Sequence, residues 1–434
     1  MKRGQSLISA YRALTRMLGL FAWPFLRWRL ARGKEEAGRC REKVGYSRRN
    51  RPAGRLAWLH GASVGEALAL LPLVERLTMR GFTVLVTTGT VTSAQILAQR
   101  LGAGALHQYA PLDVPGFVAR FLDHWQPDIV LIAESELWPN TLCEVHRRNV
   151  PLVLVNARVS ARSFARWQRL PETIASLLGR IDLCLAQTQE DATRLLRLGA
   201  PRVQVCGNLK YDVSALPADN GDLTRLMADI GPRPVWLAAS THPGEEILIG
   251  EVHLALLPRF PALLTLIAPR HAQRGARIAA DLSHMGLKTE LRSQARSIGT
   301  GVQVYVADTM GEMGLLYRAS NVVFVGKSLA SGFGNGTGGQ NPIEPAKLGA
   351  AILHGPHVGN FREVYAALDA SRAGAIIADA GSLAQALAGL LGDAARLRGM
   401  ARAAQDIVAN LGGATDKIMQ ALEPYMLQIM MRQS

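Results

Sequence analysis

The chain has 434 residues, 48% of them hydrophobic and 19% charged, so it is long enough for two domains and can fill ordinary globular cores. Its formal net charge of +15 is concentrated at the start, because residues 1–55 hold 15 Lys or Arg against 3 Glu, which leaves only +3 for the rest. The 4 cysteines lie far apart without a Cys-x-x-Cys pair, which indicates neither a zinc site nor a disulfide framework and fits a reducing compartment.

The sequence pattern of residues 1–54 predicts a membrane-associated amphipathic helix followed by a basic segment. Apolar residues recur every three or four positions on one side of this helix, and polar or basic residues gather on the other. The apolar side consists of Leu7, Tyr11, Leu14, Leu18, Phe21 and Phe25. The polar side consists of Lys2, Gln5, Ser9, Arg12 and Arg16.

The composition of this segment favours a helix that lies on a membrane rather than one that crosses it. Its longest charge-free stretch, 17–26, is shorter than the ~20 residues that span a bilayer. Arg12 and Arg16 interrupt the apolar core that a signal peptide would need. Trp23 and Trp28 stand among basic residues, which suits the headgroup zone of an anionic membrane. The alternative is a helix that only packs on the protein.

Two stretches of the chain alternate short apolar runs with helical patterns, which predicts two doubly wound parallel sheets of the α/β class. In the first domain, 55–208, the expected strands are 55–60, 83–88, 128–133, 151–155, 182–187 and 203–206. Residues 209–234, rich in Pro and Gly, are interpreted as a linker. In the second domain, 235–412, the expected strands are 235–239, 263–268, 302–307, 322–326, 351–354 and 375–378. Residues 413–434 are expected to form a C-terminal helix.

Glu66 is the first candidate for a catalytic residue. It follows the first expected strand, and apolar residues recur at helical spacing from Leu68 to Leu77, so Glu66 lies in the first turn of a helix. In open α/β sheets ligands bind beyond the carboxyl ends of the strands, which is where this turn lies. However, Ser63 to Glu66 also spells S-x-x-E, a capping box in which the Glu closes the start of the helix. Both interpretations remain open.

Further polar residues follow the other strands of the first domain. Glu134 and Glu136 flank one turn and could bind a polar acceptor or assist proton transfer, or they could cap the helix that begins at Trp138. Arg158 follows the next strand, and Lys210 comes farther on. This edge of the first domain is therefore expected to be polar and acidic.

In the second domain a glycine-rich loop follows the strand 322–326 and leads into a helix near Pro342. The N–H groups of such a loop can cradle a phosphate at a helix N-terminus, and Glu344, one turn into the helix, could bind ribose hydroxyls. The alternative is a surface loop followed by an ordinary helix. A G-x-G-x-x-G match and a P-loop-like match in this region have the wrong spacing and give no strong support for NAD or ATP.

Three other strand ends of the second domain are expected at the same edge. Ser240 and Thr241 follow one strand, Arg270 follows the next, and residues 311–317 follow a third. Small hydroxyls, a cation and helix N-termini at neighbouring strand ends suit an anionic nucleotide. Each feature taken alone could be a helix cap or a surface charge.

Eight ordered blocks cover nearly the whole chain: WLHGASVGE, ESELWPN, NARVS, GNLKYD, AASTHPGEE, APRH, GEMGLLY and GGQNPIEPAKLG. Together they resemble the 3-deoxy-D-manno-octulosonic acid (Kdo) transferases of lipopolysaccharide assembly in Gram-negative bacteria. The resemblance implies a GT-B fold with two Rossmann-like domains facing a cleft, the acceptor on the N-terminal domain and CMP-Kdo on the C-terminal one. It also implies inverting transfer of Kdo to the lipid A precursor lipid IVA by a monotopic enzyme at the cytoplasmic face of the inner membrane.

The resemblance also implies roles for individual residues. Glu66 matches the general base that takes the proton of the acceptor hydroxyl. The residues expected to hold the donor are Ser240, Thr241, Arg270, Gly311, Gly314, Gly338, Gly339, Asn341 and Glu344. The residues expected near the acceptor or the donor sugar are Glu134, Glu136, Arg158 and Lys210. The implied partners are CMP-Kdo, the lipid A precursor and an anionic membrane surface, without nucleic acid, a metal or a cofactor.

Two departures from the family pattern stand in the glycine-rich loop. Gln340 occupies a position where many relatives have His, and Gln can donate a hydrogen bond but cannot carry a charge. Residues 330–337 lengthen the loop and are interpreted as a mobile lid. Other functions remain as alternatives: a GT-B transferase with another nucleotide sugar, an NAD-dependent oxidoreductase, and a non-catalytic membrane-recruitment protein.

Overall fold

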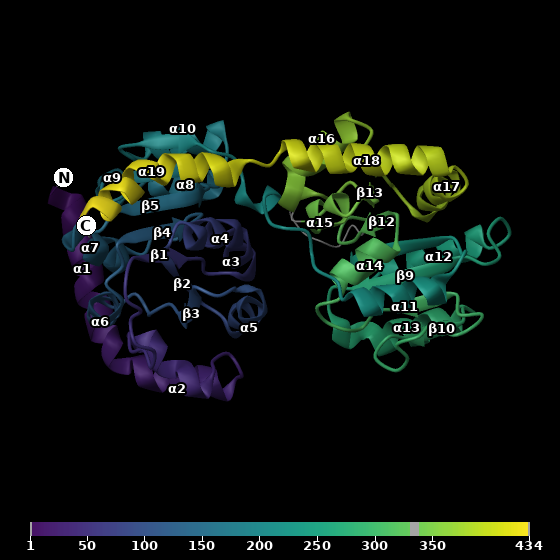
Figure 1. Ribbon diagram of the computed structural model, residues 1–434, viewed down its shortest axis with the longest axis horizontal. Helices are drawn as coiled ribbons and strands as arrows, with labels where there is room; N and C mark the ends of the chain where they lie inside the picture. Colours follow the sequence, from purple (N-terminus) through teal and green to yellow (C-terminus); the bar gives the residue numbers. More distant parts are fainter. Residues whose placement is uncertain (1, 330–337, 433–434) are drawn as a thin grey trace. The chain divides into compact units, whose positions relative to one another are not determined.

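The computed structural model describes residues 2–329 and 338–432. The chain divides into two compact units, one formed by Met1–Val213 with Gly412–Ser434 and the other by Ser214–Leu411 (Figure 1). Each unit contains a seven-stranded sheet in which all neighbouring strands are parallel. The boundary at Val213 means that most of the predicted linker, 209–234, belongs to the second unit, where it forms helix α11 (Asn220–Ile230).

The sheet of unit 1 has the strand order β3-β2-β1-β4-β5-β6-β7, so the order reverses direction beside β1. Its strands are β1 (Leu56–His60), β2 (Thr83–Thr88), β3 (Ala105–Tyr109), β4 (Ile129–Ala133), β5 (Leu152–Ala157), β6 (Leu183–Ala186) and β7 (Val203–Val205). The helices that follow these strands are α3 (Val64–Ala69), α4 (Leu71–Met79), α5 (Val91–Arg100), α6 (Pro115–Trp125), α7 (Pro139–Arg147), α8 (Ala161–Trp167), α9 (Pro171–Leu178) and α10 (Gln189–Arg197).

Successive side chains of β1 enter two different cores because side chains alternate across a strand. Ala57 and Leu59 join the core formed with α3, α4 and the C-terminal helix α19 (Ala414–Arg432). Leu56 and Trp58 join the core formed with α6, α7 and α9. Both faces of the sheet are thus buried, which explains the nearly continuous apolar sequence of its strands.

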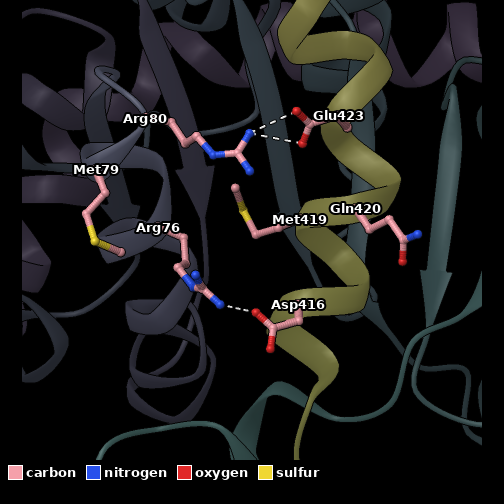
Figure 2. Close-up of a pocket in the computed structure, with 7 residues that line it drawn as sticks. All are labelled: Arg76, Met79, Arg80, Asp416, Met419, Gln420 and Glu423. Carbon is pink, nitrogen blue, oxygen red and sulfur yellow. Dashed lines mark hydrogen bonds and ion pairs between the residues drawn. The ribbon is translucent and has the colours of Figure 1, made fainter.

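The C-terminal helix α19 therefore belongs to unit 1, although the chain has passed through unit 2 before it. The carboxylate of Asp212 accepts hydrogen bonds from the backbone of Gly413 and Thr415 at the start of this helix. Arg76 of α4 pairs with Asp416 of α19, and Arg80, which follows α4, pairs with Glu423, across an open groove of about 540 Å³ (Figure 2).

The sheet of unit 2 has the order β10-β11-β9-β8-β12-β13-β14, and its direction reverses between β8 and β12. Its strands are β8 (Val235–Thr241), β9 (Leu264–Pro269), β10 (Thr289–Leu291), β11 (Val304–Val306), β12 (Val322–Val325), β13 (Ala351–His354) and β14 (Gly374–Ile376). Besides α11, its helices are α12 (Glu245–Leu256), α13 (Gly275–His284), α14 (Met313–Ala319), α15 (Ile343–Lys347), α16 (Arg362–Ala370), α17 (Ala380–Leu391) and α18 (Ala394–Asn410).

The two parallel sheets and most of their strands confirm the predicted fold class, and the differences lie in short elements. The strands β3 and β10, each at one edge of its sheet, were not predicted. The single helix expected after Glu66 is divided into α3 and α4. Pro72 in the first turn of α4 has no N–H to donate, which explains the interruption.

The N-terminal segment forms α1 (Lys2–Leu18), η1 (Gly19–Phe21), α2 (Ala22–Ala31) and η2 (Ala37–Val44). Helix α1 packs against α9, and a Cβ at Gly4 would lie only 2.4 Å from the carbonyl oxygen of Glu172. Arg12, expected on the basic outer side, instead pairs with Glu144 at 2.7 Å. The helix therefore attaches through a face that carries Gly4, Arg12 and the buried Ile8, which joins the core of unit 1. Among the described residues, no helix has the length and apolar character needed to cross a membrane.

The large apolar side chains on the other side of α1 remain exposed, as do many of those of η1 and α2. We call these exposed side chains the apolar belt: Leu7, Leu14, Met17, Leu18, Leu20, Phe21, Trp23, Phe25 and Trp28. Each is at least 45% exposed. Among the described residues of the chain, no other stretch of similar length exposes so many large apolar side chains.

Candidate active site

Three carboxylates gather at the edge of unit 1 where the strand order reverses. The turn after β1 carries Glu66, and the turn after the neighbouring strand β4 carries Glu134 and Glu136. Burial raises the pKa of Glu136, and the nearby negative charges of Glu66 and Glu134 raise it further. The structure thus brings these three predicted residues together at the position where open α/β sheets bind their ligands.

The carboxylate of Glu66 is held by the turn that precedes its helix. Its Oε2 accepts a hydrogen bond from the backbone N–H of Ala62 at 2.9 Å, and its Oε1 accepts one from the hydroxyl of Ser63 at 2.7 Å. The backbone N–H of Glu66 donates to Ser63 Oγ in return. One half of the predicted capping box therefore forms, the bond from the N–H of Glu66 to Ser63, while the Glu66 side chain accepts the N–H of Ala62 in place of that of Ser63. These bonds fix the orientation of a half-buried carboxylate at the sheet edge.

The other two carboxylates do not cap α7. That helix begins beyond Trp138, and its first N–H groups, those of Asn140 and Thr141, donate to the carboxylate of Asp113. Glu136 instead accepts a hydrogen bond from the indole N–H of Trp138 at 2.6 Å. The capping alternative for Glu134 and Glu136 is therefore wrong, and both side chains are left for another role.

Lys210 is the cation of this edge. Its Nζ lies 2.8 Å from Oε1 of Glu134. The backbone of Glu134 has a φ of 54°, a left-handed conformation that is uncommon for residues other than glycine. The segment that carries Lys210 is positioned by Asn156, whose side-chain oxygen accepts the N–H of Leu209. Arg158, the remaining predicted residue of this edge, is exposed beyond β5.

In unit 2 the loops after β8 and β12 meet where the strand order reverses. The buried carboxylate of Glu245 accepts four backbone N–H groups, from His242, Lys327, Ser328 and Leu329, at 2.8–3.2 Å. The loops pack so closely that a Cβ at Gly326 would lie 2.7 Å from the carbonyl oxygen of Ser240. Glu245 thus fixes both loops at the edge where the donor residues were predicted.

Ser240 and Thr241 have different positions in this edge. Ser240 has a φ of 55° and is only partly buried. Thr241 is fully buried, and its hydroxyl donates to Glu246, which also pairs with Arg274. Thr241 therefore stabilises the edge from the protein interior, while Ser240 is accessible at its surface.

Several cations surround His242 at the same edge. Burial, together with the nearby positive charges of Lys327, Arg270 and Arg274, lowers the pKa of His242 to about 4. At neutral pH the imidazole is therefore uncharged. The predicted residue Arg270 is exposed here, beyond β9. An edge with this excess of positive charge favours an anionic ligand.

Gln340 lies beside this histidine. Its side-chain amide is 3.0 Å from Nε2 of His242, a distance that fits an amide donating to the neutral ring. Its backbone carbonyl accepts the hydroxyl of Tyr365 at 2.8 Å. Gln340 therefore takes part in the edge through hydrogen bonds alone.

The predicted glycines of unit 2 are mainly close-packing positions. A Cβ at Gly338 would lie 2.2 Å from the carbonyl oxygen of His357, and one at Gly339 would lie 2.9 Å from Cα of Val358. A Cβ at Gly314 would lie 2.1 Å from the carbonyl oxygen of Pro217. These three glycines let backbone segments approach each other, whatever ligand binds nearby.

The remaining predicted donor residues surround α15 and α14. Asn341 accepts the N–H of Ile343 at 3.0 Å and so supports the start of α15. Burial raises the pKa of Tyr317 in α14, and the nearby charge of Glu344 in α15 raises it further. Gly311 has a φ of 86° and open space around its Cα. Residues 330–337, the predicted lid, lie outside the described residues.

The sequence did not reveal the roles of Glu245, Lys327 and His242 at this edge. The spacing of Glu245 from β8 shows only an acid in the first turn of a helix, which is common because it complements the helix dipole. Its four N–H donors come mainly from a loop about 80 residues later, so nothing local reveals them.

Comparison with known proteins identifies the family. The family model described as 3-deoxy-D-manno-octulosonic-acid transferase (kdotransferase) matches residues 38–213. The chain is 36% identical over 432 residues to the 3-deoxy-D-manno-octulosonic acid transferase of Bordetella pertussis, covering 96% of this chain and 98% of that protein. It is 35% identical over 378 residues to a probable mitochondrial 3-deoxy-D-manno-octulosonic acid transferase of Arabidopsis thaliana, covering 85% of this chain and 84% of that protein.

Among solved structures, the chain resembles UDP-GlcNAc 2-epimerase from Neisseria meningitidis bound to UDP-GlcNAc, with a TM-score of 0.58. That match covers 86% of this chain and 100% of the epimerase at 15% identity, so it speaks for the GT-B-like fold alone. The family follows instead from the sequence relatives, which match nearly from end to end. The chain belongs to the Kdo transferase family, the glycosyltransferases of lipopolysaccharide biosynthesis.

Proposed function

We propose that this protein is an inverting glycosyltransferase that moves Kdo from CMP-Kdo to a hydroxyl group of the lipid A precursor lipid IVA. The observation that carries the proposal is the Glu66 carboxylate, oriented by Ala62 and Ser63 beside Glu134 and Glu136. Membership of the Kdo transferase family supports Kdo as the transferred sugar.

Glu66 is suited to act as the general base. A carboxylate has about four acceptor positions on its two oxygens, and the capping interaction occupies two of them. The others can accept a substrate hydroxyl without breaking the cap. In this proposal capping and catalysis do not exclude each other, because the hydrogen bonds of the turn hold the base in one orientation.

In the proposed reaction the oxygen of the acceptor hydroxyl forms a bond to the anomeric carbon of Kdo, on the face opposite the nucleotide. The bond from that carbon to the phosphate oxygen of CMP breaks, and CMP leaves with the bonding electrons. The proton of the hydroxyl passes to Glu66. Lys210, paired with Glu134, can bind a carboxylate or a hydroxyl of either sugar.

The donor is proposed to bind at the edge of unit 2 that carries Ser240, Lys327 and Arg270. The positive charges that keep His242 neutral also favour the binding of a phosphate at this edge. CMP-Kdo enters as a substrate, and the proposal requires no cofactor. Among the described residues, no cluster of three or more His, Cys, Asp or Glu is placed to hold a metal ion.

The apolar belt supports a monotopic position at the cytoplasmic face of the inner membrane. It lies next to basic residues, and the guanidinium of Arg32 stacks over the ring of Trp28 at 4.1 Å. Each Lys or Arg near an anionic membrane adds about 1 kcal/mol to binding. A lipid acceptor would then be met at the surface in which it resides.

The donor half of the proposal is tested by titrating CMP and UDP calorimetrically into the wild type and into Glu245→Gln. We expect CMP to bind, and we expect its affinity to fall about tenfold or more in the variant, because Gln cannot accept four N–H donors and the loops after β8 and β12 lose their support.

The matched control is Glu251→Gln, an exposed position on the same helix α12, which should leave the affinity unchanged. Stronger binding of UDP than of CMP would favour the alternative, a GT-B transferase with another nucleotide sugar. Unaltered CMP binding by a folded Glu245→Gln would show that the donor lies elsewhere.

A further inference from the structure

A cavity of about 270 Å³ lies in unit 1 between helix α2 and the carboxyl ends of the strands. Phe25 and Arg29 of α2 form one side of it, and Trp58, Ala62 and Trp138 contribute to the other. Neither the motifs of the sequence nor the roles proposed above assign an occupant to it.

The cavity connects two surfaces that already have proposed roles. Ala62 donates the N–H that holds Glu66, and Trp138 donates its indole N–H to Glu136, so one end adjoins the carboxylates. Phe25 belongs to the apolar belt, so the other end adjoins the proposed membrane surface. A ligand in this cavity would reach from the belt toward the base.

The charged groups that line the cavity already have partners within the protein. The Nε of Arg29 lies 2.6 Å from Glu35, and the Nζ of Lys43 donates to the carbonyl oxygen of Gly89 at 2.8 Å. Asp113, another group of the lining, is a carboxylate that accepts the N–H groups of Asn140 and Thr141 and would repel an anion. The cavity therefore offers little to a phosphate or a carboxylate.

Apart from His60 and Thr141, the rest of the lining favours an apolar ligand. Leu112, Pro111 and Ala110 face the cavity together with the aromatic rings. Pockets that bury a whole drug-sized ligand have volumes of ~300–1,000 Å³, so this one suits one flexible segment of a larger molecule. In an amphiphilic acceptor, such a segment is a hydrocarbon chain.

We propose that the cavity beneath α2 receives one acyl chain of the lipid acceptor and so places the acceptor hydroxyl at Glu66. This inference rests on the proposed function and deepens it, because it makes acyl-chain length a determinant of the substrate. It also gives the N-terminal segment a second task, as a wall of the acceptor site.

The proposal is tested by filling the cavity with Ala110→Leu in the full-length protein. Transfer is measured with the tetraacylated lipid A precursor and with an analogue that carries shorter acyl chains. We expect kcat/KM for the long-chain acceptor to fall about tenfold relative to the short-chain one, since the added atoms fill part of the cavity that the longer chain would occupy. Ala103→Leu, at an exposed position of the same unit, should leave the ratio unchanged.

A binding measurement independent of activity accompanies this assay. Dodecyl maltoside brominated on its alkyl chain should quench tryptophan fluorescence less in Ala110→Leu than in Ala103→Leu, because Trp58 and Trp138 line the cavity. Equal losses with both acceptors, or equal quenching in both variants, would overturn the proposal. Absence of Kdo transfer by the wild type together with cavity-dependent quenching would instead refute the proposed function and keep the chain-binding cavity.

Discussion

We expect the Glu66→Gln variant to lose at least about 10²-fold in kcat for Kdo transfer while its melting temperature stays unchanged. Gln lacks the basic oxygen that takes the acceptor proton. It nevertheless serves as well as Glu at the third position of a capping box, so the turn from Ala62 to Glu66 should keep its structure. Single-turnover kinetics with saturating donor and acceptor measure the chemical step, and circular dichroism follows the melting.

Glu75→Gln provides the control, because this glutamate is exposed on the neighbouring helix α4. It should leave both kcat and the melting temperature as they are. A Glu66→Gln protein with normal melting and normal kcat would restrict Glu66 to its capping role. The base would then have to be sought at Glu134 or Glu136.

The second large effect is expected at the membrane. Replacing Leu18, Leu20 and Phe21 of the apolar belt together by Ser should weaken binding to vesicles containing phosphatidylglycerol by more than about tenfold, since each apolar side chain buried in lipid contributes roughly 1 kcal/mol or more. These side chains are 55%, 78% and 66% exposed, so the protein core is left intact. Cosedimentation with the vesicles measures the binding.

Met227, Met310 and Ile376 are large exposed apolar residues of unit 2, and their replacement by Ser is the matched control. That triple variant should bind vesicles as the wild type does. If the belt variant also binds as the wild type does, the belt is not the docking surface. A loss seen equally with neutral and anionic vesicles would assign the binding to apolar burial without help from the basic residues.

The sheet architecture was predictable because strands buried on both faces read as continuous apolar runs. The segment IVLIA of β4 is an example, and all five of its residues are buried. The edge strand β3 has the mixed sequence ALHQY and is only partly buried, and β10 has the sequence TEL with only its Leu buried, so neither has that signature. Edge strands lack a neighbour on one side, which removes the pressure for apolar residues.

The candidate site was predictable only as a set of strand ends. Glu66 and Glu134 stand at the ends of β1 and β4, but that these strands are neighbours depends on pairing that no local pattern encodes. The four-way contact of Glu245 is non-local for the same reason. The alternation of strands and helices predicts that the loops after the strands lie at one edge of the sheet. The order of the strands decides which residues meet at that edge.

The N-terminal helix shows a different limit. Periodicity predicted an amphipathic helix at α1, and it is one. Periodicity could not tell which side attaches to the protein. The contact is made by Gly4, where the absent side chain admits Glu172, by the buried Ile8, and by the ion pair of Arg12 with Glu144. The periodicity alone is the same for an apolar side that faces the protein and for one that faces outward.

The central claim is that this protein transfers Kdo to a lipid. The most direct measurement mixes the purified full-length wild type with freshly generated CMP-Kdo and the tetraacylated lipid A precursor, and determines the mass of the lipid product. We predict a lipid that has gained one or more Kdo residues, with release of CMP. An unchanged lipid beside intact CMP-Kdo would contradict the account.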